Sequence, residues 1–301
     1  MRIGLSGGGA SVERVVEQAE AAERDGFTSL WYPSGASGDP LVTMAIAGRA
    51  TRTLELGTAV LQTYPCHPLL MAARAASVVS AMGRPGLTLG IGPSHAPLVE
   101  GVYGYSYDRA GLHTEEYTRI LTAALRGEPV DVTGELVSAH GAGRVTGPDQ
   151  PIPVLVAALA PRLLRVAGEL ADGTVTWMAN ARAVGEHVSP RIRAAAAGRT
   201  TRIVVGLPVA VHDDVDAARQ EAAAQFAMYG TLPNYRRILD IGGAAGPADA
   251  AIIGDEDHVA REITALFDAG ATDVWAAPFA VGDRRASRAR TRAVLAALAA
   301  A

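Results

Sequence analysis

The sequence lacks lysine altogether, so all 27 of its basic side chains are arginines. The net charge is only −4, and no segment gathers arginine into a basic patch, so we expect no nucleic-acid partner. No hydrophobic run reaches the roughly 18 to 20 residues that span a bilayer. The N-terminus enters a strand-like segment without the charged and apolar regions of a signal peptide. We therefore expect a cytoplasmic protein that has no membrane partner.

Cysteine is almost absent as well. The single Cys66 excludes a disulfide within the chain and fits a reducing compartment. Aromatic residues make up 5% of the 301-residue chain, whereas hydrophobic residues as a whole make up 49%, so aliphatic and alanine side chains must carry the core. The sequence contains no H-E-x-x-H motif, clustered cysteines or run of carboxylates, and we expect no metal site.

Short apolar runs alternate with amphipathic stretches along the whole chain. Eight runs are typical of strands buried on both faces, and they cover residues 3–6, 28–32, 54–60, 87–91, 154–158, 174–177, 202–210 and 272–276. Helices are predicted over residues 12–25, 40–50, 68–82, 114–126, 162–171, 214–229, 235–241, 257–269 and 287–300. Residues 93–112 are predicted to form a long loop, and residues 127–150 an excursion or hairpin.

Eight strand–helix units favour an α/β fold of the (β/α)₈ TIM barrel type. The extra segments predict insertions after strands 4 and 7, in one domain over residues 1–301. A doubly wound sheet is the main alternative.

A glycine-rich turn, Gly7-Gly8-Gly9, follows the first strand, where a dinucleotide-binding loop would lie. The third glycine position of that motif holds Val12, and the second strand ends without a carboxylate for a ribose hydroxyl. These departures favour a flexible loop at the catalytic face.

The segment from Gly57 to Pro68 leads a strand into a helix across the face where barrel enzymes place their chemistry. Gly57 and Ala59 are small enough to let a flat ring approach the backbone. His67 lies at the predicted helix N-terminus, whose field disfavours the imidazolium, so it is either a neutral hydrogen-bonding group or a residue that packs the helix entry. Cys66 has no apparent base beside it, which favours loop packing over a nucleophilic role.

Four segments carry a resemblance to a known family: residues 22–31, residues 57–68, residues 90–95 and the stretch from Pro153 to Gly173. In their order and spacing they resemble the luciferase-like barrel oxidoreductases, and among these the branch that uses the deazaflavin coenzyme F420. Residues 254–274 are similar to the last helix and strand of that family. The resemblance implies a redox enzyme that forms a homodimer.

The resemblance also implies where the cofactor binds. A bulge after the third strand, with a non-prolyl cis peptide bond between Ala59 and Val60, would back the deazaflavin ring. Backbone amides of Ala158, Leu159 and Ala160 would bind its phosphate, in agreement with the affinity of helix N-termini for anions. The other cofactor-binding residues implied by position are Ser34, Thr58, Gln62, His67 and Met178.

Sugar-phosphate dehydrogenases of this family carry an acid and a histidine after the second strand, where this chain has Ser34 and Gly35. They carry a glutamate after the fourth strand, where this chain has His95. These differences favour a reductase that transfers hydride from the reduced deazaflavin to an activated C=C or C=N bond of a small-molecule substrate. Histidine titrates near pH 6.5, so His95 is the candidate catalytic proton donor. Its alternative is a loop histidine bonded to the backbone.

Tyr103, Tyr105 and Tyr107 alternate in the predicted strand-4 insertion. They can wall the substrate site, with one of them as an alternative proton donor, or simply anchor the loop to the barrel. Two other functions stay open. One is an FMN-dependent monooxygenase or reductase of the same superfamily, and the other is a relative that binds a cofactor without catalysis.

Overall fold

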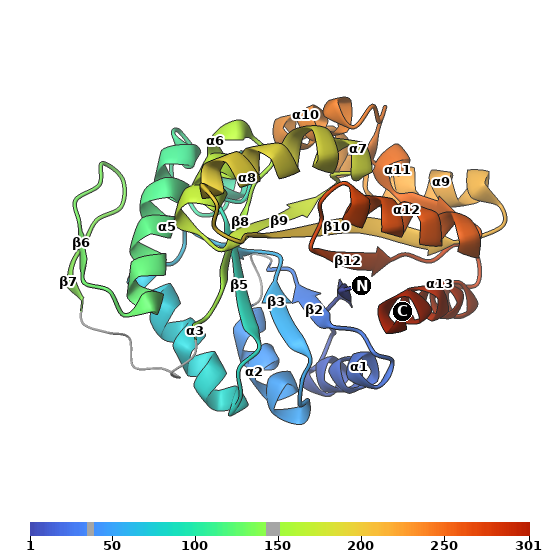
Figure 1. Ribbon diagram of the computed structural model, residues 1–301, viewed down its shortest axis with the longest axis horizontal. Coiled ribbons are helices and arrows are strands. Elements are labelled where there is room, and N and C mark those ends of the chain that lie inside the picture. The colour runs from blue at the N-terminus through green and yellow to red at the C-terminus, as the bar shows by residue number, and fades with distance from the viewer. Residues whose placement is uncertain (35–38, 143–150) are drawn as a thin grey trace.

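Eight parallel strands form a closed barrel in the computed structural model of the chain, which describes residues 1–34, 39–142 and 151–301 (Figure 1). In chain order the strands are β1 (Ile3–Ser6), β2 (Ser29–Tyr32), β3 (Glu55–Thr58) with its short continuation β4 (Leu61–Gln62), β5 (Leu87–Gly92), β8 (Val154–Ala157), β9 (Gly173–Trp177), β10 (Arg202–Val211) and β12 (Asp273–Pro278).

The barrel closes because β12 pairs with β1, while β10 pairs with both β9 and β12. A doubly wound sheet would leave two open edges, so the predicted (β/α)₈ barrel is confirmed. The short β4 lies outside the predicted strands, and so does β11 (Ile252–Gly254), which pairs with the end of β10, over Val209–Val211. Strand β11 has only three residues, too few for a periodic pattern to reveal.

Helices surround the barrel and follow its strands (Figure 1). They are α1 (Val12–Arg24), α2 (Pro40–Ala50), α3 (Pro68–Met82), α5 (Ala110–Arg126), α6 (Pro161–Leu170), α8 (Ser189–Ala196), α12 (Glu256–Asp268) and α13 (Arg284–Ala300). The helical segment after β9 begins with α7 (Ala181–Ala183) and a π-helical turn over Val184–Val188. It was not among the predicted helices, although the side chain of Asn180 caps it by accepting the N–H of Ala183 at 3.0 Å.

The two predicted insertions are present. After β5 the chain forms α4 (Ala96–Gly101), and after α5 a hairpin of β6 (Val130–Val132) and β7 (Ala139–Ala142). After β10 come α9 (Val215–Gln225), a 3₁₀ turn over Ala227–Gly230, α10 (Pro233–Ile241) and α11 (Pro247–Ala250). The prediction of a continuous loop over residues 93–112 was wrong for α4 and the first turn of α5, because a six-residue helix depends on packing rather than on its own propensity.

The predicted strand over residues 54–60 is interrupted. The peptide bond between Ala59 and Val60 is cis, as the resemblance implied, and it separates β3 from β4. The chain therefore turns at the C-terminal end of the third barrel strand, at the face where barrel enzymes carry their active sites.

The barrel interior is filled by Trp31, Leu155, Val175, Val204 and Trp275. Glycine makes room for both indoles. A Cβ atom on Gly57 would lie 2.4 Å from the ring of Trp31, and one on Gly206 would lie 2.0 Å from the ring of Trp275. The flat ring that Gly57 admits is thus the indole of Trp31, which corrects the expectation that this glycine makes room for a bound ring.

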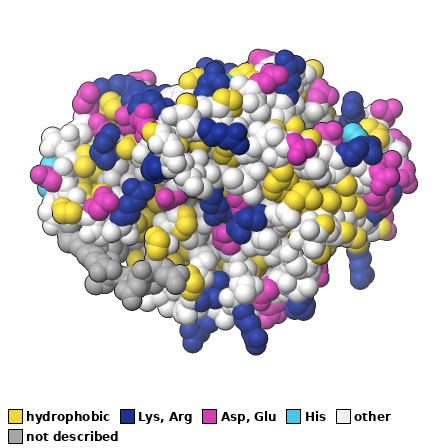
Figure 2. Space-filling view, in the orientation of Figure 1, with side chains coloured by type: hydrophobic (Ala, Val, Ile, Leu, Met, Phe, Trp, Pro, Cys, Tyr) yellow, Lys and Arg dark blue, Asp and Glu magenta, His cyan; other side chains and the backbone are white. Residues whose placement is uncertain are grey.

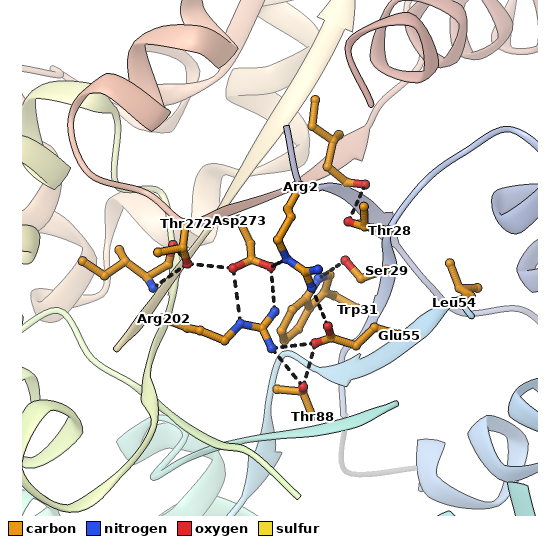
Figure 3. A network of polar contacts seen from close by, with 12 residues as sticks. Arg2, Thr28, Ser29, Trp31, Leu54, Glu55, Thr88, Arg202, Thr272 and Asp273 are labelled. Carbon is orange, nitrogen blue, oxygen red and sulfur yellow. Dashed lines mark hydrogen bonds and ion pairs between the residues drawn. The ribbon is translucent and has the colours of Figure 1, made fainter. Parts of the chain in front are cut away.

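A network of charged side chains closes the N-terminal end of the barrel (Figure 3). Arg202 pairs with Asp273 at 2.6 Å and with Glu55 at 2.8 Å, and Arg2 pairs with the same two carboxylates at 2.7 and 2.6 Å. Thr88 donates to Glu55 at 2.6 Å. Two guanidinium groups and two carboxylates therefore balance one another in this network.

The face of the molecule in Figure 2 carries arginine and acidic side chains interspersed among neutral ones. No helix in the described residues is long and apolar enough to cross a membrane.

Candidate functional site

A cavity opens at the C-terminal ends of the barrel strands and encloses about 720 Å³ of space up to and including its open mouth. The insertion that follows β10, the seventh barrel strand, places α10 over this cavity. The lining residues are Ala59, Val60, Gly92, Pro93, Ser94, His95, Ala157, Ala158, Leu159, Ala160, Leu163, Val175, Thr176, Trp177, Asn234, Tyr235 and Trp275. Of the eleven residues predicted for the site, the structure brings six together here: Ala59, Val60, His95, Ala158, Leu159 and Ala160.

The backbone at the cavity is unusual at the ends of two strands. Ser94 follows β5 with φ +64°, and Met178 follows β9 with the same value. Left-handed backbone is costly for residues other than glycine and persists only where the surroundings enforce it. Tyr107 holds the first of these turns by donating its hydroxyl to the carbonyl of Ser94 at 2.7 Å. Met178 is itself buried and lies beside the cavity, next to the lining residue Trp177, rather than in the lining.

His95 occupies the N-cap position of α4 and is half-buried in the cavity wall. Its ring lies 5.6 Å from that of Tyr235, which belongs to α10. Burial lowers the pKa of His95 below the usual value for histidine. The imidazole is therefore mainly neutral near pH 7, and its protonated form becomes abundant only in more acidic solution.

The neighbouring part of the wall is formed where β8 leads into α6, at Ala157, Ala158, Leu159 and Ala160. Ala160 is the N-cap residue and offers no side-chain hydrogen bond to the helix, so the first-turn N–H groups of Arg162 and Leu163 have no capping partner. His187 holds the turn from the other side, with Nε2 2.8 Å from the carbonyl oxygen of Leu159. This wall has the properties of an anion site made by a helix N-terminus.

Three further predicted residues support the loops instead of lining the cavity. Thr58 is fully buried and donates to the carbonyl of Gly90 at 2.7 Å. Gln62 donates to the carbonyl of Ser34 at 3.3 Å and accepts the hydroxyl of Tyr103. The contacts of Gln62 join the chain after β2 and the short strand β4 to the insertion that follows β5, the fourth barrel strand.

His67 lies in a different place. Its Nδ1 atom accepts the N–H of Leu69 at 3.3 Å, and Nε2 is 3.1 Å from the carbonyl oxygen of Ser138. The residue thus caps α3 and binds the β6–β7 turn, as the helix-entry interpretation predicts. It lines a second cavity of about 1360 Å³ between the β4–α3 turn, α5 and the hairpin.

Cys66 lies in the same second cavity, where its sulfur accepts from Arg74 at 3.5 Å. Of the three alternating tyrosines, Tyr103 donates its hydroxyl to Gln62 and Tyr107 donates its hydroxyl to the carbonyl of Ser94, whereas Tyr105 is exposed. The first two therefore anchor the insertion.

Sequence reasoning missed several lining residues, above all Asn234, Tyr235 and Trp275. Trp275 could have been found, because it lies toward the C-terminal end of the last barrel strand. No feature of the sequence marks Asn234 and Tyr235 as lining residues. They reach the cavity only because the insertion after β10 brings α10 over it. Within the described residues, no group of three or more histidine, cysteine or acidic side chains is arranged to hold a metal ion.

Comparison with known proteins agrees with this geometry. The profile of the family described as luciferase-like monooxygenase matches residues 2–301. A 5,10-methylenetetrahydromethanopterin reductase of Methanolobus tindarius is 24% identical over 300 residues, which cover 88% of this chain and 90% of the relative.

Two solved structures share the fold. An F420-dependent secondary alcohol dehydrogenase, in complex with an F420–acetone adduct, superposes with a TM-score of 0.77 at 19% identity over 99% of this chain and 98% of its own. The oxygenating constituent of 3,6-diketocamphane monooxygenase from Pseudomonas putida, in complex with FMN, superposes with a TM-score of 0.72 at 17% identity over 98% and 97% of the two chains.

Proposed function

The chain belongs to the luciferase-like monooxygenase family and is an oxidoreductase, and from this premise we propose that it is a reductase that uses coenzyme F420. The proposed reaction transfers hydride from the reduced deazaflavin to an activated C=C or C=N bond of a small organic molecule. The observation that carries the proposal is the cavity at the C-terminal ends of the strands, because it combines small lining side chains with the uncapped N-terminus of α6.

The residues of the cavity fit a flat ring with a phosphate-bearing chain. The side chains on β8 and the following turn are small (Ala157, Ala158 and Ala160), which leaves space in this part of the cavity. The uncapped N-terminus of α6 offers backbone N–H groups to a phosphate. A relative named as an F420-dependent dehydrogenase shares the fold, which supports the same choice of cofactor.

When bound, the reduced deazaflavin supplies the hydride. Ala59, Val60 and the turn at Ala158–Ala160 would hold the cofactor, and His95 would act on the reduced substrate. The imidazolium form of His95 gives the proton that completes the reduction and regains one from solvent. Because burial lowers the pKa of His95, this donor is most abundant in acidic solution.

Titration of the purified protein with F420 and with FMN tests the cofactor. We expect saturable quenching of deazaflavin fluorescence and no comparable binding of FMN. FMN binding without F420 binding would instead support a flavin monooxygenase, a candidate that the FMN-containing structural neighbour favours. F420 binding without turnover of any enone or imine would point to a protein that only binds the cofactor.

A further inference from the structure

Among the described residues, none that lines the cavity is an aspartate, glutamate or arginine, and His95 and Tyr235 lie side by side in the lining. We propose that its substrate is an uncharged, largely apolar carbonyl compound, whose carbonyl oxygen is oriented by a hydrogen bond from the hydroxyl of Tyr235. The inference rests on the proposed function, because it treats the cavity as the place where a substrate meets the cofactor.

The absence of charge is the first part of the argument. Within residues 1–34, 39–142 and 151–301, no aspartate, glutamate or arginine lines the cavity, and burial keeps the lining residue His95 mainly neutral. The helices α6 and α10 border the cavity and carry arginines. Arg162 of α6 forms an ion pair with Glu115 at 3.0 Å, and Arg237 of α10 is exposed to solvent. The N-terminus of α6 is assigned to the cofactor phosphate, so an anionic substrate would lose its hydration without gaining a counter-ion.

The second part is the aromatic wall. Trp177 and Trp275 stack with ring centroids 5.0 Å apart, and Tyr229 meets Trp177 edge-on at 5.8 Å. Tyr235 also lines the cavity, and its ring lies 4.8 Å from that of Tyr229, which supports the wall without being among the lining residues. Such a surface favours flat, apolar molecules, which gain contact area without a polar cost.

The third part is the hydroxyl group of Tyr235, which is a hydrogen-bond donor in the cavity lining. Burial raises the pKa of Tyr235 well above its usual range, so its hydroxyl stays protonated at any pH the protein tolerates. Within the described residues this hydroxyl makes no hydrogen bond. The side chain is partly exposed, and a substrate carbonyl placed between Tyr235 and His95 would accept a hydrogen bond from this hydroxyl.

An isosteric pair of ligands tests the charge preference. Benzylideneacetone and cinnamate share one skeleton and differ by a methyl group in place of a carboxylate oxygen. Calorimetric titration of the F420-loaded protein should show the ketone binding at least about ten-fold more tightly, because the anion cannot be compensated in the cavity. Equal or tighter binding of cinnamate would overturn the proposal.

The role of Tyr235 is tested by Tyr235→Phe, with Tyr105→Phe as the control because Tyr105 is exposed in the second cavity. Loss of one hydrogen bond should weaken benzylideneacetone about five- to ten-fold in the first variant, whereas the second should match the wild type. Unchanged affinity of Tyr235→Phe, with unchanged thermal unfolding, would remove Tyr235 from the proposal. Failure of the proposed function would be seen separately, as absence of F420 binding in the fluorescence titration.

Discussion

Gly57 and Gly206 decide what fills the barrel, because each leaves the space that one indole occupies. Trp31 in turn donates its Nε1–H to Ser29 at 2.9 Å, so its ring is held in one orientation. Trp275 lies above it and forms part of the cavity wall. The floor of the candidate site is thus set by residues that have no chemical role.

Gly57→Ala should destabilise the protein by about 1 to 3 kcal/mol, since the new Cβ would overlap the buried indole of Trp31. Gly101→Ala is the control, because a Cβ there would meet no atom within 4 Å among the described residues. Urea unfolding followed by tryptophan fluorescence measures both. A free energy of unfolding for Gly57→Ala equal to that of the control would contradict the packing argument.

His95 is expected to give the reaction its pH dependence. The proton donor is the imidazolium, whose pKa burial lowers, so the rate of reduction should fall as pH rises through a value below about 6.5. His95→Gln should lower kcat by about 10²- to 10⁴-fold and flatten this profile. Single-turnover oxidation of reduced F420 between pH 5 and 8 measures both effects.

His212→Gln is the matched control, since His212 is bonded to Asp214 at the surface, far along the chain from β5. If His95→Gln kept the wild-type rate and profile, another group would have to supply the proton.

At the scale of elements, α6 shows how one helix can be both structure and site. Its N-terminus lines the cavity, and Ala160 leaves it uncapped. A protein selected only for stability would place serine, threonine, asparagine or aspartate there. The missing cap is understandable if a bound anion takes its place.

Ala160→Asp should therefore stabilise the protein without cofactor by about 1 kcal/mol and weaken F420 binding at least about ten-fold, because the carboxylate occupies and repels the anion position. Ala160→Asn supplies a neutral cap and should weaken binding less. Thermal unfolding and fluorescence titration give the two readouts. Equal F420 affinity in the wild type and in Ala160→Asp would exclude this helix as the phosphate site.

At the scale of the whole molecule, the two ends of the barrel are built differently. The N-terminal end is closed by the network of Arg2, Arg202, Glu55 and Asp273, which joins β3, β10 and β12 to the start of the chain (Figure 3). Burial alone would raise the pKa of Asp273, but hydrogen bonds from Arg202, Thr272 and Arg2 outweigh it and hold the pKa below its usual value. The C-terminal end has the uncharged cavity.

Arg202→Met should cost about 3 kcal/mol near pH 7, because it leaves Asp273, 2% exposed, with Arg2 as its only basic partner in the described residues. The lowered pKa of Asp273 adds stability that is present above about pH 4 and is lost as pH falls through the lowered value. The difference in free energy of unfolding between the wild type and Arg202→Met should therefore become smaller in strong acid.

Guanidinium unfolding at pH 7 and pH 3 measures this difference. Arg290→Met is the control, since the ion pairs of Arg290 with Glu256 and Asp213 lie at the surface and should contribute little. A difference that stayed constant between the two pH values would show that Asp273 is not the group that responds.

Much of the architecture follows from local sequence. The helices over Pro40–Ala50 and Pro68–Met82 begin and end at the predicted residues, because a proline at the first position and a glycine or extended residue after the last one are local signals. The order of strands and helices predicted the barrel for the same reason. The homodimer stays a prediction.

The sequence by itself determined the barrel, its two insertions and the strand ends that carry the cavity, since apolar periodicity and helix caps act between near neighbours in the chain. Only the tertiary structure decided which side chains meet there. It brought Tyr235 against His95 across 140 positions, filled the space at Gly57 with Trp31, and moved His67 into a second cavity. Such contacts depend on barrel closure and on the path of the insertions, which no local pattern encodes.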